Sequence, residues 1–378
     1  MPNTPAVTAT LTTDLATTVT VIDACGRAHV PVLLKSDPGM GKSSLIRSIA
    51  AQDDLLCETV LGSIREPADL AGLPVVTDAG MVLEPPAWAK RLCAADGGYL
   101  FLDELMTCVP SVQAAMLAVA LDRVVGDLTL PPGVRVVAGG NPPDRGAGGY
   151  ELEPPLANRF CHLDFAPTTE EWLTGMTSGW SVPPTSRAIA ADRLARAATA
   201  AAVTGFIQVQ PNRLHEFPTT ADATGGPWPS RRSWAMLAAA LAHTRDYDTA
   251  ARQALAFGLV GEGTGVAFLT WWRDADLPDP AAVIEDPSIV DWSGRPDRVW
   301  AVLNGVVGWA TARRSAEAWR AAWAPMVACA EHGGADVATA AVRALGRIRP
   351  ASATVPASAR RFTPILQAAG LIDPEQAA

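Results

Sequence analysis

Lysine is scarce in this chain of 378 residues. Of its 30 basic residues, all but Lys35, Lys42 and Lys90 are arginines. Basic runs are also missing, and 39 acidic side chains give a net charge of −9 at pH 7. This balance argues against a surface built to hold nucleic acid or an anionic membrane, although a local basic groove is compatible with an acidic total.

Metal and targeting signals are missing as well. The six cysteines and five histidines share no spacing typical of a zinc site, and no C-x-x-C pair occurs. No apolar run approaches the roughly 18 residues of a membrane span, and no basic stretch followed by an apolar run marks a signal peptide. We therefore expect a cytoplasmic protein with reduced thiols.

The first part of the chain alternates strand-like and helix-like segments. Short apolar runs at 31–35, 99–102 and 134–138 are typical of buried strands, and helices are expected at 42–51 and 111–121. With 49% hydrophobic and 18% charged residues, the chain is expected to fold. This alternation predicts an α/β fold with a parallel sheet flanked by helices.

Beyond residue 165 the composition changes. Eleven of the 12 tryptophans lie there, in Ala-rich stretches of helical periodicity that favour a helical core over a stacking platform for bases. Pro/Gly/Asp clusters mark linkers. We expect an α/β core over 1–165, an all-α segment over 166–277 and a helical C-terminal extension over 278–378.

A glycine-rich loop follows the first apolar strand, in segment 31–44 (PVLLKSDPGMGKSS). In the pattern G-x-x-x-x-G-K-[ST], backbone N–H groups surround phosphate oxygens, Lys42 contacts the β- and γ-phosphates, and Ser43 binds Mg²⁺. Ser36 replaces the first glycine, which serves the turn and no chemistry; the alternative is a plain turn before a helix. The predicted nucleotide contacts are Asp37, Pro38, Gly39, Met40, Gly41, Lys42, Ser43 and Ser44.

An acidic pair ends the next apolar run, GYLFLDE over 98–104. Parallel sheets bind ligands at the carboxyl ends of their strands. There Asp103 is expected to hold Mg²⁺, and Glu104 to orient and deprotonate the attacking water. Taken alone, the pair is also typical of a helix N-cap.

Two further residues suit chemistry at a γ-phosphate. Asn141 follows the strand at 134–138 and suits a polar sensor, although Asn-Pro also begins turns. Arg159 ends segment 154–159 (PPLANR), where a guanidinium could neutralise transferring phosphate or simply cap a helix.

In this order the motifs resemble the AAA+ ATPase family, and within it the MoxR-like, dynein-related branch. Segments 65–72 (REPADLAG), 140–142 (GNP) and 156–160 (LANRF) look like motifs of that branch, as does the region from Asp103 to Leu117. Segment 228–234 (WPSRRSW) is similar to the start of the lid helix that carries the second sensor. The resemblance implies that Arg232, rather than Arg231, contacts the phosphates.

The resemblance covers about residues 15–270 and implies an ATP- and Mg²⁺-dependent ATPase. It implies a homo-oligomeric, hexameric ring in which Arg159 serves the neighbouring subunit's nucleotide. Members act as chaperone-like remodellers, often with a partner that carries a von Willebrand factor A domain. Segment 73–83 (LPVVTDAGMVL) predicts a β-hairpin, either facing the ring pore as in that branch or a plain surface hairpin.

Three other functions compete with a remodelling ATPase. A nucleotide-gated binding module with little turnover would use the same loop. The acidic total counts against a nucleic-acid motor. A small-molecule kinase also begins with a phosphate loop, but it leaves Asn141, Arg159 and Arg232 unexplained together.

Overall fold

The alternating strands of the first half form one parallel sheet. Its strands are β1 (Thr12–Thr13), β2 (Val32–Lys35), β3 (Cys57–Leu61), β6 (Gly98–Asp103), β9 (Val134–Gly140) and β10 (Cys161–Phe165). They pair in the order β1-β10-β2-β9-β6-β3, with every pairing parallel. The predicted α/β class with a flanked parallel sheet and a helical C-terminal region is confirmed.

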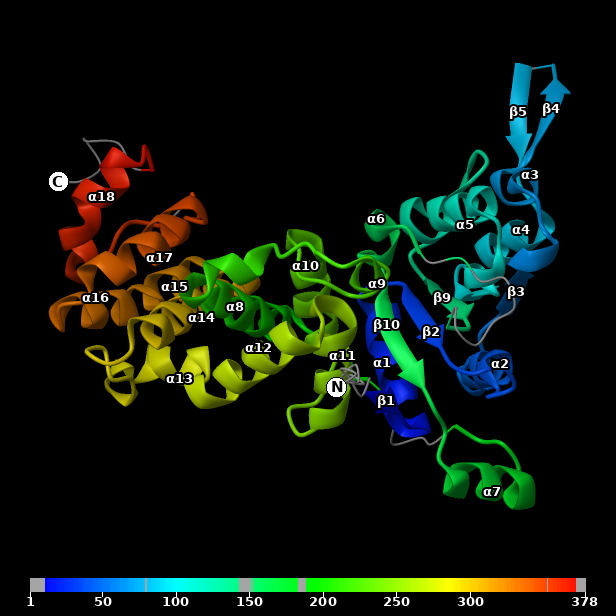
Figure 1. Ribbon diagram of the computed structural model, residues 1–378. Helices are drawn as coiled ribbons and strands as arrows, with labels where there is room; N and C mark the ends of the chain where they lie inside the picture. The colour runs from blue at the N-terminus through cyan, green and yellow to red at the C-terminus, as the bar shows by residue number, and fades with distance from the viewer. Residues whose placement is uncertain are drawn as a thin grey trace. The chain divides into compact units, whose positions relative to one another are not determined.

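The computed structural model describes residues 11–78, 80–142, 150, 152–182, 188–351 and 353–371. They form two compact units (Figure 1). The first holds the described residues up to Ala190 together with His215–Val266, and the second holds Ala191–Leu214 and the described residues from Ala267 onward. The three-part division drawn from the sequence stays a prediction.

Helices cover both faces of the sheet. They are α1 (Leu15–Arg27), α2 (Lys42–Gln52), α4 (Ala87–Ala94) and α5 (Pro110–Asp122). Leu100 and Leu102 pack in one buried cluster with Trp88 of α4 and Met116 of α5. Phe101 alternates with them along β6 and therefore faces the other side, where α1 and α2 contact the sheet. Burial on both faces explains why these strands read as continuous apolar runs.

The first unit holds further short elements. Its helices are α3 (Pro67–Ala71), α6 (Pro154–Ala157), α7 (Thr169–Ser178), α9 (Ala221–Thr224), α10 (Arg231–Leu241) and α11 (Thr249–Val260). Two hairpins pair β4 (Leu73–Thr77) with β5 (Gly80–Glu84) and β7 (Val124–Val125) with β8 (Leu128–Thr129). The predicted hairpin over 73–83 is thus confirmed, and most of its apolar side chains are exposed, Val76 by 83% and Met81 by 73%.

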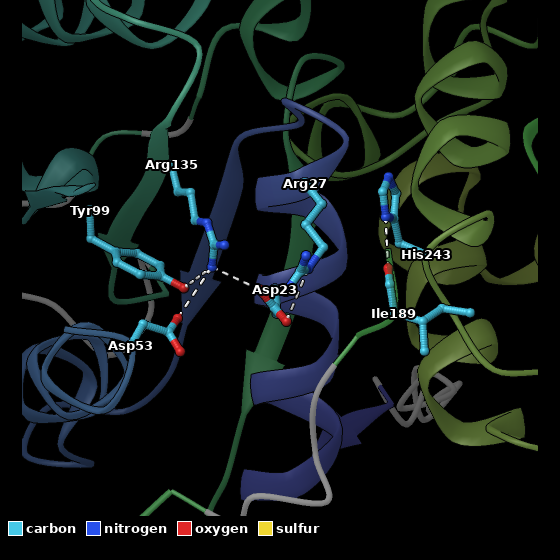
Figure 2. A network of polar contacts seen from close by, with 7 residues as sticks. All are labelled: Asp23, Arg27, Asp53, Tyr99, Arg135, Ile189 and His243. Carbon is cyan, nitrogen blue, oxygen red and sulfur yellow. Dashed lines mark hydrogen bonds and ion pairs between the residues drawn. The ribbon is translucent and has the colours of Figure 1, made fainter. Parts of the chain in front are cut away.

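A polar network joins the amino ends of two strands to two helices (Figure 2). Arg135, near the start of β9, donates to Asp23 of α1 at 2.7 Å and to the Tyr99 hydroxyl at 2.7 Å. The same nitrogen lies 3.4 Å from Asp53, at the end of α2. Arg27 forms a second ion pair with the buried Asp23 carboxylate, at 3.3 Å. Burial raises the pKa of Tyr99 to about 12, and the guanidinium of Arg135 opposes this rise.

The second unit is all helical in the residues described. It contains α8 (Arg193–Val209), α13 (Pro280–Glu285), α14 (Pro296–Arg313), α15 (Ala316–Ala321), α16 (Trp323–Glu331), α17 (Ala335–Arg347) and α18 (Thr363–Ala368). Helix α12 (Glu262–Ala275) belongs to it from Ala267 onward, and its earlier residues belong to the first unit. Trp319 and Trp323 meet edge to face at 5.4 Å in its core. Trp271 packs against Phe206 and donates to Asp297 at 2.8 Å. These tryptophans are core residues, as predicted. No described helix is long and apolar enough to cross a membrane.

Candidate nucleotide site

Three strands end side by side where the sequence places its polar residues. Lys35, the last residue of β2, pairs with Gly140 of β9, and Leu102 of β6 pairs with Ala138 of the same strand. The glycine-rich loop, Asn141 and the acidic pair therefore leave the sheet from neighbouring strands, at its carboxyl edge. Residues about 60 and 100 positions apart become neighbours because β9 lies between β2 and β6.

Lys42 opens α2 and turns its ammonium toward the strand ends. It donates to the Asn141 Oδ1 at 2.6 Å, to the Ser36 Oγ at 2.8 Å and to the Ser36 carbonyl at 3.2 Å. Partial burial lowers the pKa of Lys42, and the carboxylates of Asp103 and Asp37 oppose this shift. The ammonium is thus held beside acceptors at a point where a phosphate oxygen can replace one of them.

Ser43 and Asp103 contact each other directly. The Ser43 hydroxyl donates to Asp103 Oδ2 at 2.8 Å, and the backbone N–H of Glu104 donates to Asp103 Oδ1 at 2.9 Å. A hydroxyl and a carboxylate are oxygen ligands of the kind that Mg²⁺ prefers. This pair therefore fits the metal that the loop implies, with Ser43 and Asp103 as its protein ligands.

Glu104 adopts a left-handed backbone conformation, with φ 59° and ψ 32°. Such values are uncommon outside glycine and cluster at functional sites. Its carbonyl accepts bonds from Thr107 and Cys108, at 2.9 and 3.1 Å. Its carboxylate is half-buried and has no hydrogen bond to any residue that the structure describes. The role of Glu104 as general base stays a prediction.

The loop itself is open. Gly39 and Gly41 have φ values of 81° and 87°, and a Cβ built on either meets no atom within 4 Å. Positive φ values favour glycine, and the free space leaves room for phosphate oxygens at the N-terminus of α2. Asp37, Pro38 and Gly41 are exposed, which agrees with a loop that receives a ligand.

A cleft of about 620 Å³ continues from the loop. One wall consists of loop and α2 residues, and the other is formed by the segment around α7. The lining includes Met40, Ser44, Leu45, Trp172 and Trp180. Trp180 packs over Gly175, where an added Cβ would come within 2.4 Å of the indole. The sequence did not predict that Trp172 and Trp180 line a cleft. Both side chains are exposed, unlike the buried tryptophans of the second unit.

Arg159 and Arg232 take no part in the contacts given above for the loop, Asp103 and Asn141. Arg159 follows α6 and is half-buried, and Arg232 is exposed in the first turn of α10, as is Arg231. Neither has an ion pair with another described residue. The structure therefore brings together the loop, Asp103, Glu104 and Asn141, and it leaves the roles of the two arginines as predictions.

Asn158 links the two arginine-bearing elements, and the sequence reasoning missed it. Its Nδ2 donates to the Trp228 carbonyl at 2.7 Å, and its Oδ1 accepts from the Ser230 hydroxyl at 2.5 Å. Ser230 is the N-cap of α10 and also accepts from the Ser233 N–H at 3.1 Å. The turn that carries Arg159 is thereby fastened to the start of the helix that carries Arg232.

Comparison with known proteins shows similarity to a curated protein in sequence and to solved structures in fold. Over 132 residues the chain is 32% identical to the transcriptional regulatory protein XylR of Pseudomonas putida. The aligned segment covers 32% of this chain and 23% of that protein. The chain therefore spans less than a quarter of this curated relative. A crystal structure described as a "putative ATPase" from Cytophaga hutchinsonii aligns over 66% of this chain and 84% of that one, with a TM-score of 0.40 and 16% identity. No protein-family model matches.

The glycine loop, the acidic pair and the sensor position stand at the ends of adjacent parallel strands, in the chain order that the resemblance implies. The described residues of the sheet are followed by helices alone, again as expected. The chain thus has an α/β fold in which a six-stranded parallel sheet carries the glycine loop and its contact residues at the carboxyl edge.

Proposed function

We propose that the chain is an ATPase that binds Mg-ATP at the glycine loop and hydrolyses it with Glu104 as general base. The observation that carries this proposal is the contact set of Lys42 with Asn141 and of Ser43 with Asp103, at 2.6 and 2.8 Å. Magnesium, when bound, neutralises charge on the phosphates. The chain's own residues orient the γ-phosphate through Lys42 and Asn141 and remove the proton of the attacking water at Glu104.

The cleft supports a nucleoside triphosphate rather than a simple polyphosphate. Its volume lies in the range of small-molecule sites, and its apolar walls suit a base and a ribose beside the loop. Calorimetry with Mg-ATP and with magnesium tripolyphosphate measures the contribution of the nucleoside. We expect Trp180→Ala to weaken ATP binding and to leave tripolyphosphate binding unchanged.

Steady-state hydrolysis tests the activity. Glu104→Gln removes the base and should lower kcat at least a hundredfold while ATP still binds, because general-base catalysis contributes about 10²–10⁴ in rate. Lys42→Ala should weaken ATP binding strongly, because it removes the ammonium that contacts the phosphates. Glu285→Gln makes the same chemical change at an exposed glutamate of α13 and serves as the control. Hydrolysis unchanged in Glu104→Gln would refute the assignment, and tight binding without turnover in the unmodified chain would favour the gated module.

We further propose that the chain works in a MoxR-like, hexameric ring that remodels a protein partner. The exposed hairpin of β4 and β5 supports this proposal, because large apolar side chains on a free hairpin suit contact with a protein substrate. Arg159 would then complete the neighbouring subunit's site. Mixing Lys42→Ala and Arg159→Ala subunits should restore hydrolysis that neither variant shows alone. If the mixture is as inactive as each variant alone, Arg159 does not act on the nucleotide of a neighbouring subunit.

A further inference from the structure

Ser36 stands where the phosphate-loop pattern has glycine, and its side chain contacts the functional lysine. The residue is buried, and its N–H donates to the Gly140 carbonyl at 3.3 Å, one residue before Asn141. Its hydroxyl donates to the Asp37 carbonyl at 2.9 Å and accepts from the Lys42 ammonium at 2.8 Å. The glycine that Ser36 replaces supplies no chemistry at the first loop position, and the sequence did not predict this contact of the Ser36 hydroxyl.

The hydrogen bonds of the ammonium explain what the hydroxyl adds. An ammonium has three N–H donors, and Lys42 directs them at three acceptors. Two of these acceptors, the carbonyl and the hydroxyl, belong to Ser36, and the third is Asn141 Oδ1. A glycine would supply the carbonyl alone. Because the hydroxyl proton is already directed to Asp37, the lone pairs of Ser36 Oγ face Lys42.

We infer that Ser36 is a positioning residue, which orients the Lys42 ammonium so that its third donor points at the phosphate position. In the contact set described, that donor is bonded to Asn141. An arriving phosphate oxygen takes this donor, and the amide oxygen of Asn141 is released while both bonds to Ser36 persist. Nucleotide arrival is thereby coupled to a change in the hydrogen bonding of the sensor. The inference rests on the proposed nucleotide site.

The experiment compares Ser36→Ala, Ser36→Gly and Ser36→Thr in the full chain, with Mg-ATPγS binding by calorimetry and ATP hydrolysis as readouts. Loss of a charge-assisted hydrogen bond should weaken binding and raise KM roughly tenfold in the Ala and Gly variants, with kcat changed less than twofold. The Thr variant keeps the hydroxyl and should restore binding. Ser111→Ala removes an exposed serine hydroxyl near the start of α5 and controls for the substitution itself.

A double-mutant cycle separates positioning from general damage to the loop. In the Lys42→Ala background, Ser36→Ala should weaken the residual binding of Mg-ATPγS no further, because its effect passes through the ammonium. Binding within twofold of the unmodified chain in both Ser36→Ala and Ser36→Gly would overturn the inference while leaving the nucleotide site intact. An equal loss in the Lys42→Ala background would also overturn it. An unmodified chain that binds no nucleotide would refute the proposed function and the inference with it.

Discussion

Gly139 provides the sharpest test of how the sheet positions the magnesium ligand. The residue lies in β9 beside the end of β6, and a Cβ built on it would stand 2.8 Å from Asp103 Oδ1 and 2.8 Å from the ring of Phe101. Ordinary contacts begin near 3.5 Å, so Gly139→Ala requires a shift of about 0.7 Å. Phe101 is fully buried and cannot move outward, which directs the displacement to the carboxylate.

The expected effects are a loss of stability and a specific loss of magnesium dependence. Overpacking of this kind costs about 1–3 kcal/mol, offset by about 0.5–1 kcal/mol from the lower entropy of the unfolded chain. The net loss should be about 1–2 kcal/mol in urea unfolding. A displaced carboxylate also loses its bond from either Ser43 or Glu104, which are 2.8 and 2.9 Å away. Affinity for Mg²⁺ should fall at least tenfold, as it does when groups supporting a metal ligand are disturbed.

The assay measures nucleotide binding with magnesium and with EDTA. Gly139→Ala should lose the increment that magnesium adds and keep the binding seen in EDTA. Gly263→Ala is the matched control, because a Cβ there meets nothing within 4 Å in α12 and should stabilise the chain slightly. A Gly139→Ala chain with an unchanged urea midpoint and an unchanged magnesium increment would refute this account of the site.

Three further predictions concern groups outside the phosphate loop. Asn158→Ala should cost about 2–3 kcal/mol in urea unfolding, because it leaves buried partners on the α10 cap unsatisfied; a loss below 0.5 kcal/mol would contradict the fastening of that cap. Tyr99→Phe should remove from an absorbance titration a tyrosine that ionises near pH 12. Because the pKa of Tyr99 in the folded chain is raised above its unfolded value of 10, the contribution of Tyr99 to the free energy of unfolding is complete below pH 10. That contribution is lost as the pH rises toward 12. Burial and, to a lesser extent, Lys35 lower the pKa of His162 to about 3, so stability should fall with pH from 6.5 toward 3, and His162→Gln should flatten that fall in acid unfolding curves.

The sequence predicts the sheet best where strands are buried on both faces. The runs at 99–102 and 134–138 became β6 and β9, because a strand covered by helices on both sides must be apolar throughout. Strand β10 (CHLDF) gives a weaker pattern, since it carries a histidine and an aspartate. Asp164 pairs with Lys35 at 3.3 Å, and Nε2 of His162 forms a hydrogen bond with the Ala157 carbonyl at 2.8 Å.

In the candidate site, too, local sequence patterns are predictable and contacts between distant residues are not. The loop and acidic pair are local patterns with fixed spacing, and the structure brings them together. The bonds of Asn158 to residues 70 and 72 positions away depend on how the turn after α6 meets α10, and no local pattern records that meeting. The contacts of the Ser36 hydroxyl could not be predicted for another reason. A mismatch to a motif shows which residue is replaced, but it does not show which atoms the new side chain contacts.

The hairpin of β4 and β5 can change its sequence with little effect on folding. Its side chains project from the unit, and its base is fixed by the Asp127 carboxylate bonded to the Leu83 N–H at 2.8 Å and by Gly72 and Gly126, which leave no room for a Cβ. Substitutions of the exposed side chains of this hairpin therefore open no cavity in the core. Under the proposed function, the contact surface of the hairpin and the nucleotide site at the sheet edge can change independently of each other.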